Sequence, residues 1–167
     1  VAGDVVGVQS SGIGNIARAD VQGLQGSGIF NYASGRVGGV QSATVNIAGR
    51  IDGIQAGAFN HAGTVRGVQL GVVNTAGEMH GLPIGLINVA GNGGIELHLW
   101  AGGMSDANTG VLFRSGSVYT RFAAGFAGGI RPGYTAEHNV SFGFHLGARI
   151  TAGGFYVDVD AGIATFE

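Results

Sequence analysis

A short repeat fills the first half of the chain and constrains its fold more than any other feature. Each copy begins with glycine, an apolar residue and glutamine. The glycines that open the six copies are Gly7, Gly23, Gly39, Gly53, Gly67 and Gly81. The steps between successive opening glycines are therefore 16, 16, 14, 14 and 14 positions. Six copies at a nearly constant spacing predict one structural unit that is used six times.

The polar and small residues of the repeat recur as regularly as its glycines. The glutamines are Gln9, Gln25, Gln41, Gln55 and Gln69, with Pro83 in the sixth copy; the asparagines are Asn15, Asn31, Asn46, Asn60, Asn74 and Asn88; and the alanines are Ala17, Ala33, Ala48, Ala62, Ala76 and Ala90. Because the step between copies changes by an even number, every side chain keeps its own side of a strand. The pattern therefore predicts paired strands with a fixed inside and outside.

Alternation within each copy predicts strands rather than helices. Val68, Leu70 and Val72 share one parity, and glycine or glutamine occupies the positions between them. Glycine accounts for 35 of the 167 residues, and each interior glycine destabilises a helix by about 1 kcal/mol relative to alanine. We expect the Asn-x-Ala-Gly segment to be the turn between strands of about 10 residues, because asparagine and glycine favour turns.

The repeat stops near residue 93, and the remaining sequence is richer in aromatic residues but still alternates. Alternation or β-forming composition predicts strands over residues 95–100, 110–114, 118–126, 140–150 and 155–163. Residues 131–134 are expected to form a turn or loop. We therefore divide the chain into a six-copy β repeat array over residues 1–92 and a C-terminal antiparallel β region over residues 93–167, joined in one continuous structure.

Two all-β architectures fit these patterns. The first, and preferred, is an antiparallel outer-membrane-type β-barrel of about 11–12 strands, because alternating segments of about 10 residues separated by turns are typical of such barrels. The alternative is a β-solenoid of 14–16-residue coils capped by a C-terminal antiparallel β domain. In the solenoid, equivalent residues of successive coils would lie side by side and form ladders.

Composition and charge exclude several classes of function. The chain has no Cys, which excludes thiolate zinc sites and cysteine nucleophiles. Its 8 basic residues are all arginines and are dispersed, so there is no basic tract for nucleic acid. Phosphate-loop and nucleophile-elbow motifs are absent, and no two histidines have metal-ligand spacing. We therefore expect no enzymatic activity, no cofactor, no metal site and no nucleic-acid partner.

Two groups of polar side chains are candidates for an inner face or an interaction surface. The first group, which would line a pore, bind sugars or form a structural amide ladder, is Gln9, Gln25, Gln41, Gln55 and Gln69. The second group is Arg121, Arg149, Asp158 and Asp160. The two aspartates share one face of a strand, where they could bind a cation or act as acid and base. They could instead pair across strands with Arg149 or Arg121.

Three segments carry a resemblance to a known family. Residues 23–33, Gly-Leu-Gln-Gly-Ser-Gly-Ile-Phe-Asn-Tyr-Ala, match the form Gly-Leu-Gln-x-Ser-Gly-h-h-Asn-x-Ala, in which h is apolar. Residues 81–90 resemble the terminal unit of such arrays, and residues 111–119 resemble the region that follows them. In these segments the chain is similar to uncharacterised bacterial surface-repeat proteins of diderm envelopes. The resemblance implies export to the cell envelope and no catalytic residues.

Taken together, these features predict a non-enzymatic cell-envelope protein at the bacterial outer membrane or cell surface. As a barrel it would have a structural or pore role, with outer-membrane lipid as its partner. As a surface-exposed β-solenoid it would mediate protein or glycan interaction or self-assembly. Its partner would then be another envelope protein or further copies of the chain in a homo-oligomer.

Overall fold

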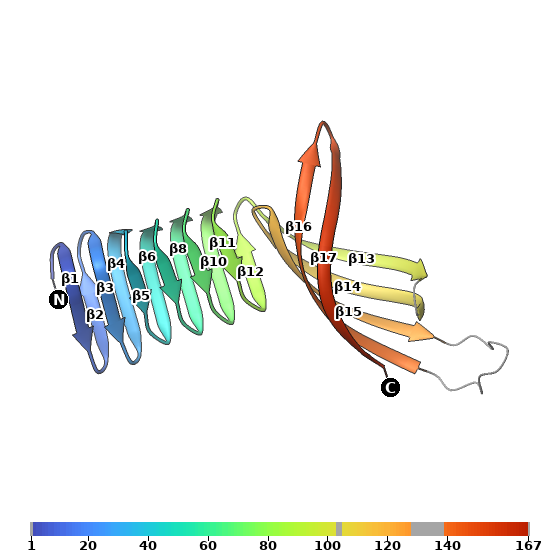
Figure 1. Cartoon of the computed structure of the whole chain (residues 1–167), viewed down its shortest axis with the longest axis horizontal. Helices are drawn as coiled ribbons and strands as arrows, with labels where there is room; N and C mark the ends of the chain where they lie inside the picture. Colours follow the sequence, from blue (N-terminus) through green and yellow to red (C-terminus); the bar gives the residue numbers. More distant parts are fainter. Residues whose placement is uncertain (1, 103–104, 128–138, 167) are drawn as a thin grey trace.

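The computed structural model describes residues 2–102, 105–127 and 139–166 (Figure 1). All regular structure in these residues is β, as predicted. They form a rod of stacked coils followed by a five-stranded antiparallel sheet. Within these ranges there is no helix of the length and apolarity needed to cross a membrane.

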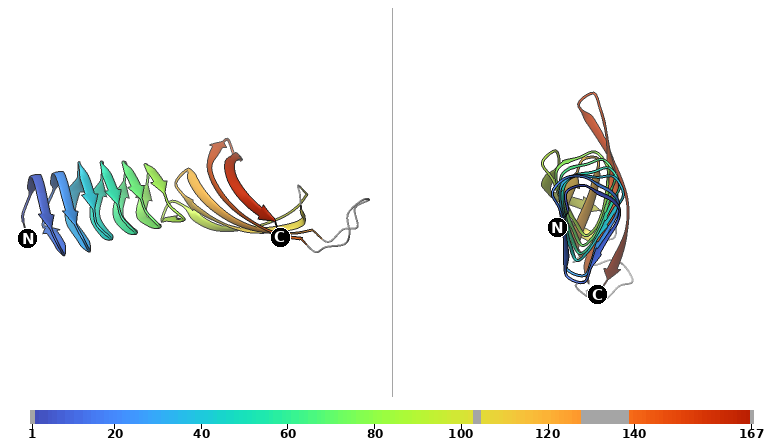
Figure 2. Two further views of the ribbon diagram at one scale, coloured as in Figure 1. Left: turned by 60° about the horizontal axis from the view of Figure 1, so that its bottom comes forward. Right: turned by 90° about the vertical axis from the view of Figure 1, so that its left-hand side faces the viewer.

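The repeat array is a β-solenoid in which each repeat forms one coil. Its strands are β1 (Val5–Ser11), β2 (Gly14–Ala17), β3 (Val21–Ser27), β4 (Phe30–Val37), β5 (Val40–Ser42), β6 (Val45–Ile51), β7 (Ile54–Ala56), β8 (Phe59–Val65), β9 (Val68–Leu70), β10 (Val73–Met79), β11 (Leu82–Ile84) and β12 (Ile87–Ala90). Each strand pairs in parallel with the strand two positions along the chain, and β3 also pairs with β4 at Val21 and Val37. Odd-numbered strands therefore form one wall of the coil and even-numbered strands form the other (Figure 2).

Equivalent residues of successive repeats lie beside one another along the rod. For example, Asn46 pairs with Asn60 and Ala48 with Ala62. The apolar part of the core consists of two buried columns, Ala17, Ala33, Ala48, Ala62, Ala76 and Ala90, and Val5, Val21, Val37, Ile51, Val65 and Met79. These columns and the amide columns described below fill the coil, so the solenoid has a packed core.

The prediction that the Asn-x-Ala-Gly segment forms a turn is wrong. Asn46, Ala48 and Gly49 all lie within β6, and Asn46 and Ala48 are buried in the core. The chain bends before the asparagine, for example at Ala43 and Thr44, and again before the next Gly-h-Gln unit. Since each repeat bends twice, its strands are only 3 to 8 residues long, shorter than predicted.

The difference in length between the longer and the shorter repeats is divided between the bend before the asparagine and an irregularity within β4. One residue is lost between the glutamine and the asparagine, which are closer by one position in the third coil, at Gln41 and Asn46, than in the second. The other is lost after the alanine, where the pairing of β4 with β6 shifts between Ala33 and Arg36. The straight segments keep their pairing, so inside and outside are preserved, as parity predicted.

The preferred prediction, a barrel of 11–12 strands formed by the whole chain, is wrong. The structure matches the alternative, a β-solenoid followed by an antiparallel region. The physical reason is the double bend in each repeat. It returns the chain to its starting side after one coil, so that identical residues stack in parallel and each buried amide lies beside its own kind. Antiparallel hairpins would place each glutamine beside an unlike residue.

The described residues after the solenoid form one antiparallel sheet with strands in chain order. Its strands are β13 (Gly94–Gly102), β14 (Ser105–Ser115), β15 (Val118–Ala127), β16 (Asn139–Ala152) and β17 (Phe155–Phe166). All five segments that were predicted as strands lie within them. The turn predicted at residues 131–134 lies outside the described residues.

The sheet covers one end of the solenoid. Asn92 exchanges two hydrogen bonds of 2.9 Å with the backbone of Met79, and the Thr120 hydroxyl donates to the Leu86 carbonyl at 2.9 Å. At the opposite end of the rod, the outer edge of β1 has no partner among the described strands. The outer edge of β2 has a single bridge, to Ala2. The solenoid is therefore closed at its last coil and open at its first.

Candidate functional site

The glutamine series forms a hydrogen-bonded column inside the coil. The Nε2 of each glutamine donates to the Oε1 of the glutamine in the preceding coil, at 2.8–2.9 Å, through Gln9, Gln25, Gln41, Gln55 and Gln69. From the second coil onward, each Nε2 also donates across the coil to a carbonyl group of the opposite wall, as Gln55 does to His61 at 3.1 Å. The glutamine column therefore ties coils to one another and joins the two walls.

Burial of this column favours the structural ladder over the ligand-binding alternatives. Gln25, Gln41, Gln55 and Gln69 are fully buried, so a ligand at the surface of the rod cannot contact them. The column ends at the sixth coil, where Pro83 takes the place of the glutamine and lies beside Gln69. The Oε1 of Gln69 accordingly accepts no hydrogen bond from the residues that the structure describes.

The asparagines form a second column, in which the amides point the opposite way. The Nδ2 of each asparagine donates to the Oδ1 of the asparagine in the following coil, at 2.8–3.1 Å, through Asn15, Asn31, Asn46, Asn60, Asn74 and Asn88. The same Nδ2 atoms donate to backbone carbonyl groups at the adjacent bend, as Asn60 does to Leu70 at 2.8 Å. A buried amide without partners is destabilising, so the stability of each coil depends on the coils beside it.

The first coil leaves both columns unfinished. Gln9 Oε1 accepts a hydrogen bond from Gln25, but Gln9 Nε2 donates to no residue in the described ranges. Asn15 Oδ1 likewise receives no donor from them, although its Nδ2 donates to Asn31. In β1, Val6 is 86 % exposed. This end of the rod therefore presents an amide donor, an amide acceptor and a free strand edge.

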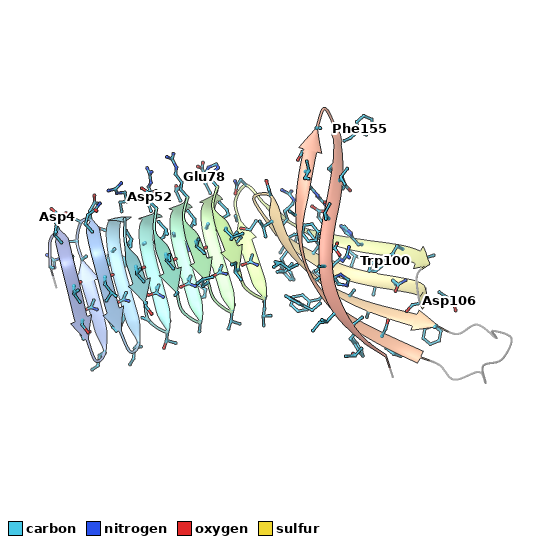
Figure 3. The ribbon with its side chains drawn as sticks, viewed as in Figure 1. Asp4, Asp52, Glu78, Trp100, Asp106 and Phe155 are labelled. Carbon is cyan, nitrogen blue, oxygen red and sulfur yellow. The ribbon has the colours of Figure 1, made fainter. Side chains whose placement is uncertain are left out.

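The charged residues of the solenoid gather along one edge. All of those between residues 2 and 92 lie at the bend before a Gly-h-Gln unit, and they are Asp4, Arg18, Asp20, Arg36, Arg50, Asp52, Arg66 and Glu78. Asp4, Asp52 and Glu78 mark this edge in Figure 3. Arg50 and Arg36 contact Asp52 at 2.8 and 3.3 Å, and the hydrogen bond from Arg50 lowers the pKa of Asp52.

The predicted residues Arg121, Arg149, Asp158 and Asp160 share one face of the antiparallel sheet, here called the polar face. It comprises the even-numbered residues of β13 and β17, the even-numbered residues of β14 from Asn108 onward, and the odd-numbered residues of β15 and β16. A bulge between Ser105 and Asn108 interrupts the alternation of β14. Arg149 donates to Asp158 at 2.7 and 2.8 Å and to Glu96 at 2.7 and 3.0 Å. Glu96 lies three strands away from Arg149, so the sheet is curled, with its polar face on the concave side.

The contacts of Arg149 change the acidity of the groups involved. Hydrogen bonding from Arg149 lowers the pKa of Glu96 to about 2, although partial burial acts in the opposite direction. His98 and Arg114 also contact Glu96, both at 3.2 Å. The hydrogen bonds to Asp158 and Glu96 raise the pKa of Arg149. Glu96 and Arg149 therefore both keep their charge throughout the physiological pH range.

Asp160 is the centre of a second cluster on the polar face. Its carboxylate accepts hydrogen bonds from the Tyr119 hydroxyl at 2.7 Å and from Arg121 at 3.0 Å, and it lies 3.0 Å from His145 Nδ1. Burial raises the pKa of Asp160, but the Tyr119 hydrogen bond and the Arg121 charge outweigh it, so that the pKa is lowered. Asp158 and Asp160 thus each have their own arginine, as cross-strand pairing predicted.

A hollow of about 660 Å³ lies beside these clusters and is lined in part by Glu96, His98, Trp100, Arg121 and Tyr156. The guanidinium group of Arg121 lies 5.5 Å from the centre of the Trp100 ring, a cation–π contact. Among the described residues, no three His, Cys, Asp or Glu side chains are grouped so that they could hold a metal ion. The chemistry of this hollow is therefore that of paired charges and aromatic rings.

The opposite side of the sheet, here called the apolar face, carries no charged residue in its described part outside the bulge at the start of β14, which includes Asp106. Its large side chains are Ile95, Leu97, Leu99, Val111, Phe113, Phe122, Phe126, Val140, Phe142, Phe144, Leu146, Ile150, Phe155, Val157, Val159 and Ile163. Most of them are exposed; Leu97 is 71 % exposed, and Phe155, at the tip of the β16–β17 hairpin in Figure 3, is 82 % exposed. The sheet is therefore apolar on its convex side and charged on its concave side.

Comparisons with known protein families, curated proteins and solved structures give no match. The resemblance to bacterial surface-repeat proteins therefore stays a prediction. The structure does show that the first part of the chain is built from repeats and folds as a β-solenoid.

Sequence reasoning missed Glu96, Tyr119 and His145. Alternation alone could have placed Glu96 on the polar face, because its neighbour Leu97 belongs to the apolar side of the strand. No local pattern shows that Glu96 comes within hydrogen-bond distance of Arg149, which is 53 residues away in sequence. That contact depends on the curl of the whole sheet.

Proposed function

We propose that this protein is a non-enzymatic protein of the bacterial cell surface, and that the chain of 167 residues, taken by itself, self-assembles through the first coil of its β-solenoid. The unfinished amide columns of that coil carry the proposal, since Gln9 Nε2 and Asn15 Oδ1 lack partners in the described ranges. They lie beside β1, whose outer edge is also unpaired there. Open strand edges favour pairing with another β-strand. The surface location rests on the resemblance to bacterial surface-repeat proteins.

A second copy of the chain is the partner that fits the unpaired side of the first coil. Every interface within the solenoid already joins two coils of the repeat. Another first coil offers an unpaired strand edge, and its Asn15 Oδ1 is an acceptor of the kind that Gln9 Nε2 lacks. Head-to-tail stacking is blocked because Asn92 and the neighbouring sheet cover the last coil. We therefore expect two copies to meet first coil to first coil about a twofold axis, with their β1 strands antiparallel.

The contacts of the candidate polar groups support a non-enzymatic function. The buried glutamine and asparagine amides bind one another and the backbone. The two aspartates that could have formed an acid–base pair are each hydrogen-bonded to an arginine, Asp158 to Arg149 and Asp160 to Arg121. These interactions stabilise the fold of the chain itself.

Substitution of Gln9 by glutamate tests the assembly. Gln9→Glu keeps an oxygen acceptor for Gln25 but replaces the free Nε2 donor with a carboxylate oxygen, so that the interface between two copies holds two carboxylates and no donor from residue 9. Like charges in such a contact are strongly unfavourable, so we expect dimer dissociation to become about tenfold easier, or more, at pH 7. Sedimentation equilibrium in a non-ionic detergent, which masks the apolar face of the sheet, measures the dissociation constant.

The matched control is Gln22→Glu, which makes the same change of charge at an exposed position of β3. It should leave the dissociation constant of the dimer unchanged. A chain that stays monomeric from micromolar to millimolar concentration would refute the proposal. So would a dimer that both substitutions weaken equally, because the loss would then follow net charge rather than the first coil.

A further inference from the structure

We infer that the apolar face of the antiparallel sheet lies against the acyl chains of a lipid bilayer. A sheet in water normally turns its apolar side toward a protein core. Here the concave side holds the charged residues, which bond to one another, and the convex side presents a continuous exposed apolar surface. Apolar residues outside and polar residues inside are typical of β-sheets in membranes. This inference does not depend on the assembly of first coils.

The distribution of charge is the strongest support. Outside the bulge at the start of β14, which includes Asp106, every charged residue in the described part of the sheet belongs to the polar face, and these residues are Glu96, Arg114, Arg121, Arg149, Asp158 and Asp160. The side chain of Arg149 is only 10 % exposed, because Glu96 and Asp158 enclose it. The part of the sheet beyond that bulge could therefore enter hydrocarbon without carrying a charge into it, which is the main obstacle to insertion.

The dimensions of the strands fit the same partner. Strands β14 to β17 contain 11, 10, 14 and 12 residues, and a tilted strand crosses the hydrocarbon core with about 9–11 residues. The apolar face extends from Phe155 at one end of β17 to Ile163 toward the other. A protein interface would carry a polar rim around an apolar centre, whereas outside the bulge of β14 no charge interrupts the described part of this face.

The two edge strands set a condition on insertion. Strands β13 and β17 each have one edge that pairs with no described strand. Their free N–H and C=O groups would be strongly destabilising in hydrocarbon. In the bilayer, these edges must therefore pair with further β-strands, which other copies of the chain can supply.

Single cysteines provide a direct test, because the chain has no cysteine of its own. Two pairs of adjacent residues point to opposite faces, Ile150 and Thr151 on β16, and Ile163 and Ala164 on β17. Each is replaced by cysteine and labelled with a polarity-sensitive fluorophore. The full chain is then refolded with phosphatidylcholine vesicles. We expect a blue shift, and quenching by brominated acyl chains, at positions 150 and 163 but not at 151 and 164.

Other results of this labelling experiment would overturn the inference. Equal shifts at both members of each pair would indicate aggregation rather than an oriented sheet. No shift at any position, together with an oligomer in lipid-free buffer that protects positions 150 and 163, would assign the apolar face to a protein partner. Vesicles of neutral phosphatidylcholine are used so that attraction between opposite charges cannot produce binding.

Arginine substitutions give an independent measurement. An arginine on the lipid side of a membrane strand is costly enough that Leu97→Arg and Phe142→Arg should each lower vesicle binding by about 30-fold or more. Val72→Arg, at an exposed bend of the solenoid, is the matched control and should bind normally. Gln9→Glu should also bind normally, so a failure of the first-coil proposal and a failure of this inference remain distinguishable.

Discussion

At the scale of the residue, the solenoid depends on amides that satisfy one another in a core of small apolar side chains. The Nδ2 of Asn60 donates to Asn74 at 2.9 Å and to the Leu70 carbonyl at 2.8 Å, and its Oδ1 accepts from Asn46 at 3.0 Å. All three asparagines are fully buried. Removing one amide therefore leaves unsatisfied groups in the coils on both sides.

Truncation of one ladder residue should show this dependence. Asn60→Ala removes four hydrogen bonds, including the one from Asn46, and leaves Asn74 Oδ1 without its donor. We expect the free energy of unfolding to fall by about 2–4 kcal/mol, measured by urea denaturation. His61→Ala, at the exposed neighbouring position, should change it by less than about 0.5 kcal/mol. Equal losses in the two variants would mean that the asparagine column does not stabilise the coil.

The same residues show what the sequence could and could not reveal. The inward position of the glutamines followed from parity, which is a local property of the chain. The asparagines were assigned to turns because asparagine followed by a glycine commonly forms them. Their actual place in the core is set by bonds between residues 14 to 16 positions apart, which no local preference encodes.

At the scale of the element, the solenoid separates bends that can change length from straight segments that cannot. The first two coils have one more residue before the asparagine and one more after the alanine than the later coils, and still stack on them in register. Within a straight segment, loss of one residue would turn every following side chain to the opposite side. The observed differences in coil length are therefore confined to the bend before the asparagine and to the residues just after the alanine.

A pair of single-residue deletions checks this distinction. Deleting Gly28 shortens the second coil at its bend to the spacing of the third, so we expect the fold to persist with a loss of no more than about 1 kcal/mol. Deleting Ile47, within β6, should abolish folding because it turns Ala48 and the following inner residues outward. Circular dichroism and thermal melting measure both. Similar melting temperatures for the two variants would contradict this view of the coil.

The antiparallel strands, by contrast, were predictable, because each of them contains its own alternation of apolar and polar or small residues. The contact between Glu96 on β13 and Arg149 on β16 was not, because it requires the curl of four strands. The stability that this contact gives to the sheet should depend on pH, because Glu96 must be ionised to make it.

The pKa of Glu96 is about 2 in the folded protein, below its ordinary value of 4.5. A lowered pKa means that the ionised group stabilises the fold above pH 4.5 and that this stabilisation is lost as the pH falls from 4.5 toward 2. We expect Glu96→Gln to melt below the wild type at pH 7, with the difference shrinking across that interval. A difference that stays constant from pH 7 to pH 2 would exclude ionisation of Glu96 as its source.

At the scale of the whole molecule, the two parts bury apolar residues in different ways. The solenoid encloses its alanine and valine columns within each coil, whereas most large apolar side chains of the sheet are exposed. The solenoid is also a linear array in which a coil contacts mainly its immediate neighbours. The stability of such an array approximates a sum over units and their interfaces.

Extension of the array should therefore stabilise it. Duplicating residues 53–66, which form one 14-residue coil, adds one more interface with complete glutamine and asparagine contacts. We expect a higher urea midpoint for the solenoid and a larger m-value, because more surface is buried. The matched control duplicates the same residues with Gln55 and Asn60 of the added coil replaced by alanine. A midpoint that falls in the first variant would contradict the additive description.

The opposed directions of the two amide columns have an electrostatic consequence for the rod. Glutamine N–H groups point toward the first coil and asparagine N–H groups toward the last. Their dipoles therefore oppose each other in every coil, and parallel strands add little net dipole of their own. An α-helix accumulates about half an elementary charge at each end as its peptide dipoles add together. A solenoid of this repeat can instead lengthen coil by coil while its tips stay electrically neutral.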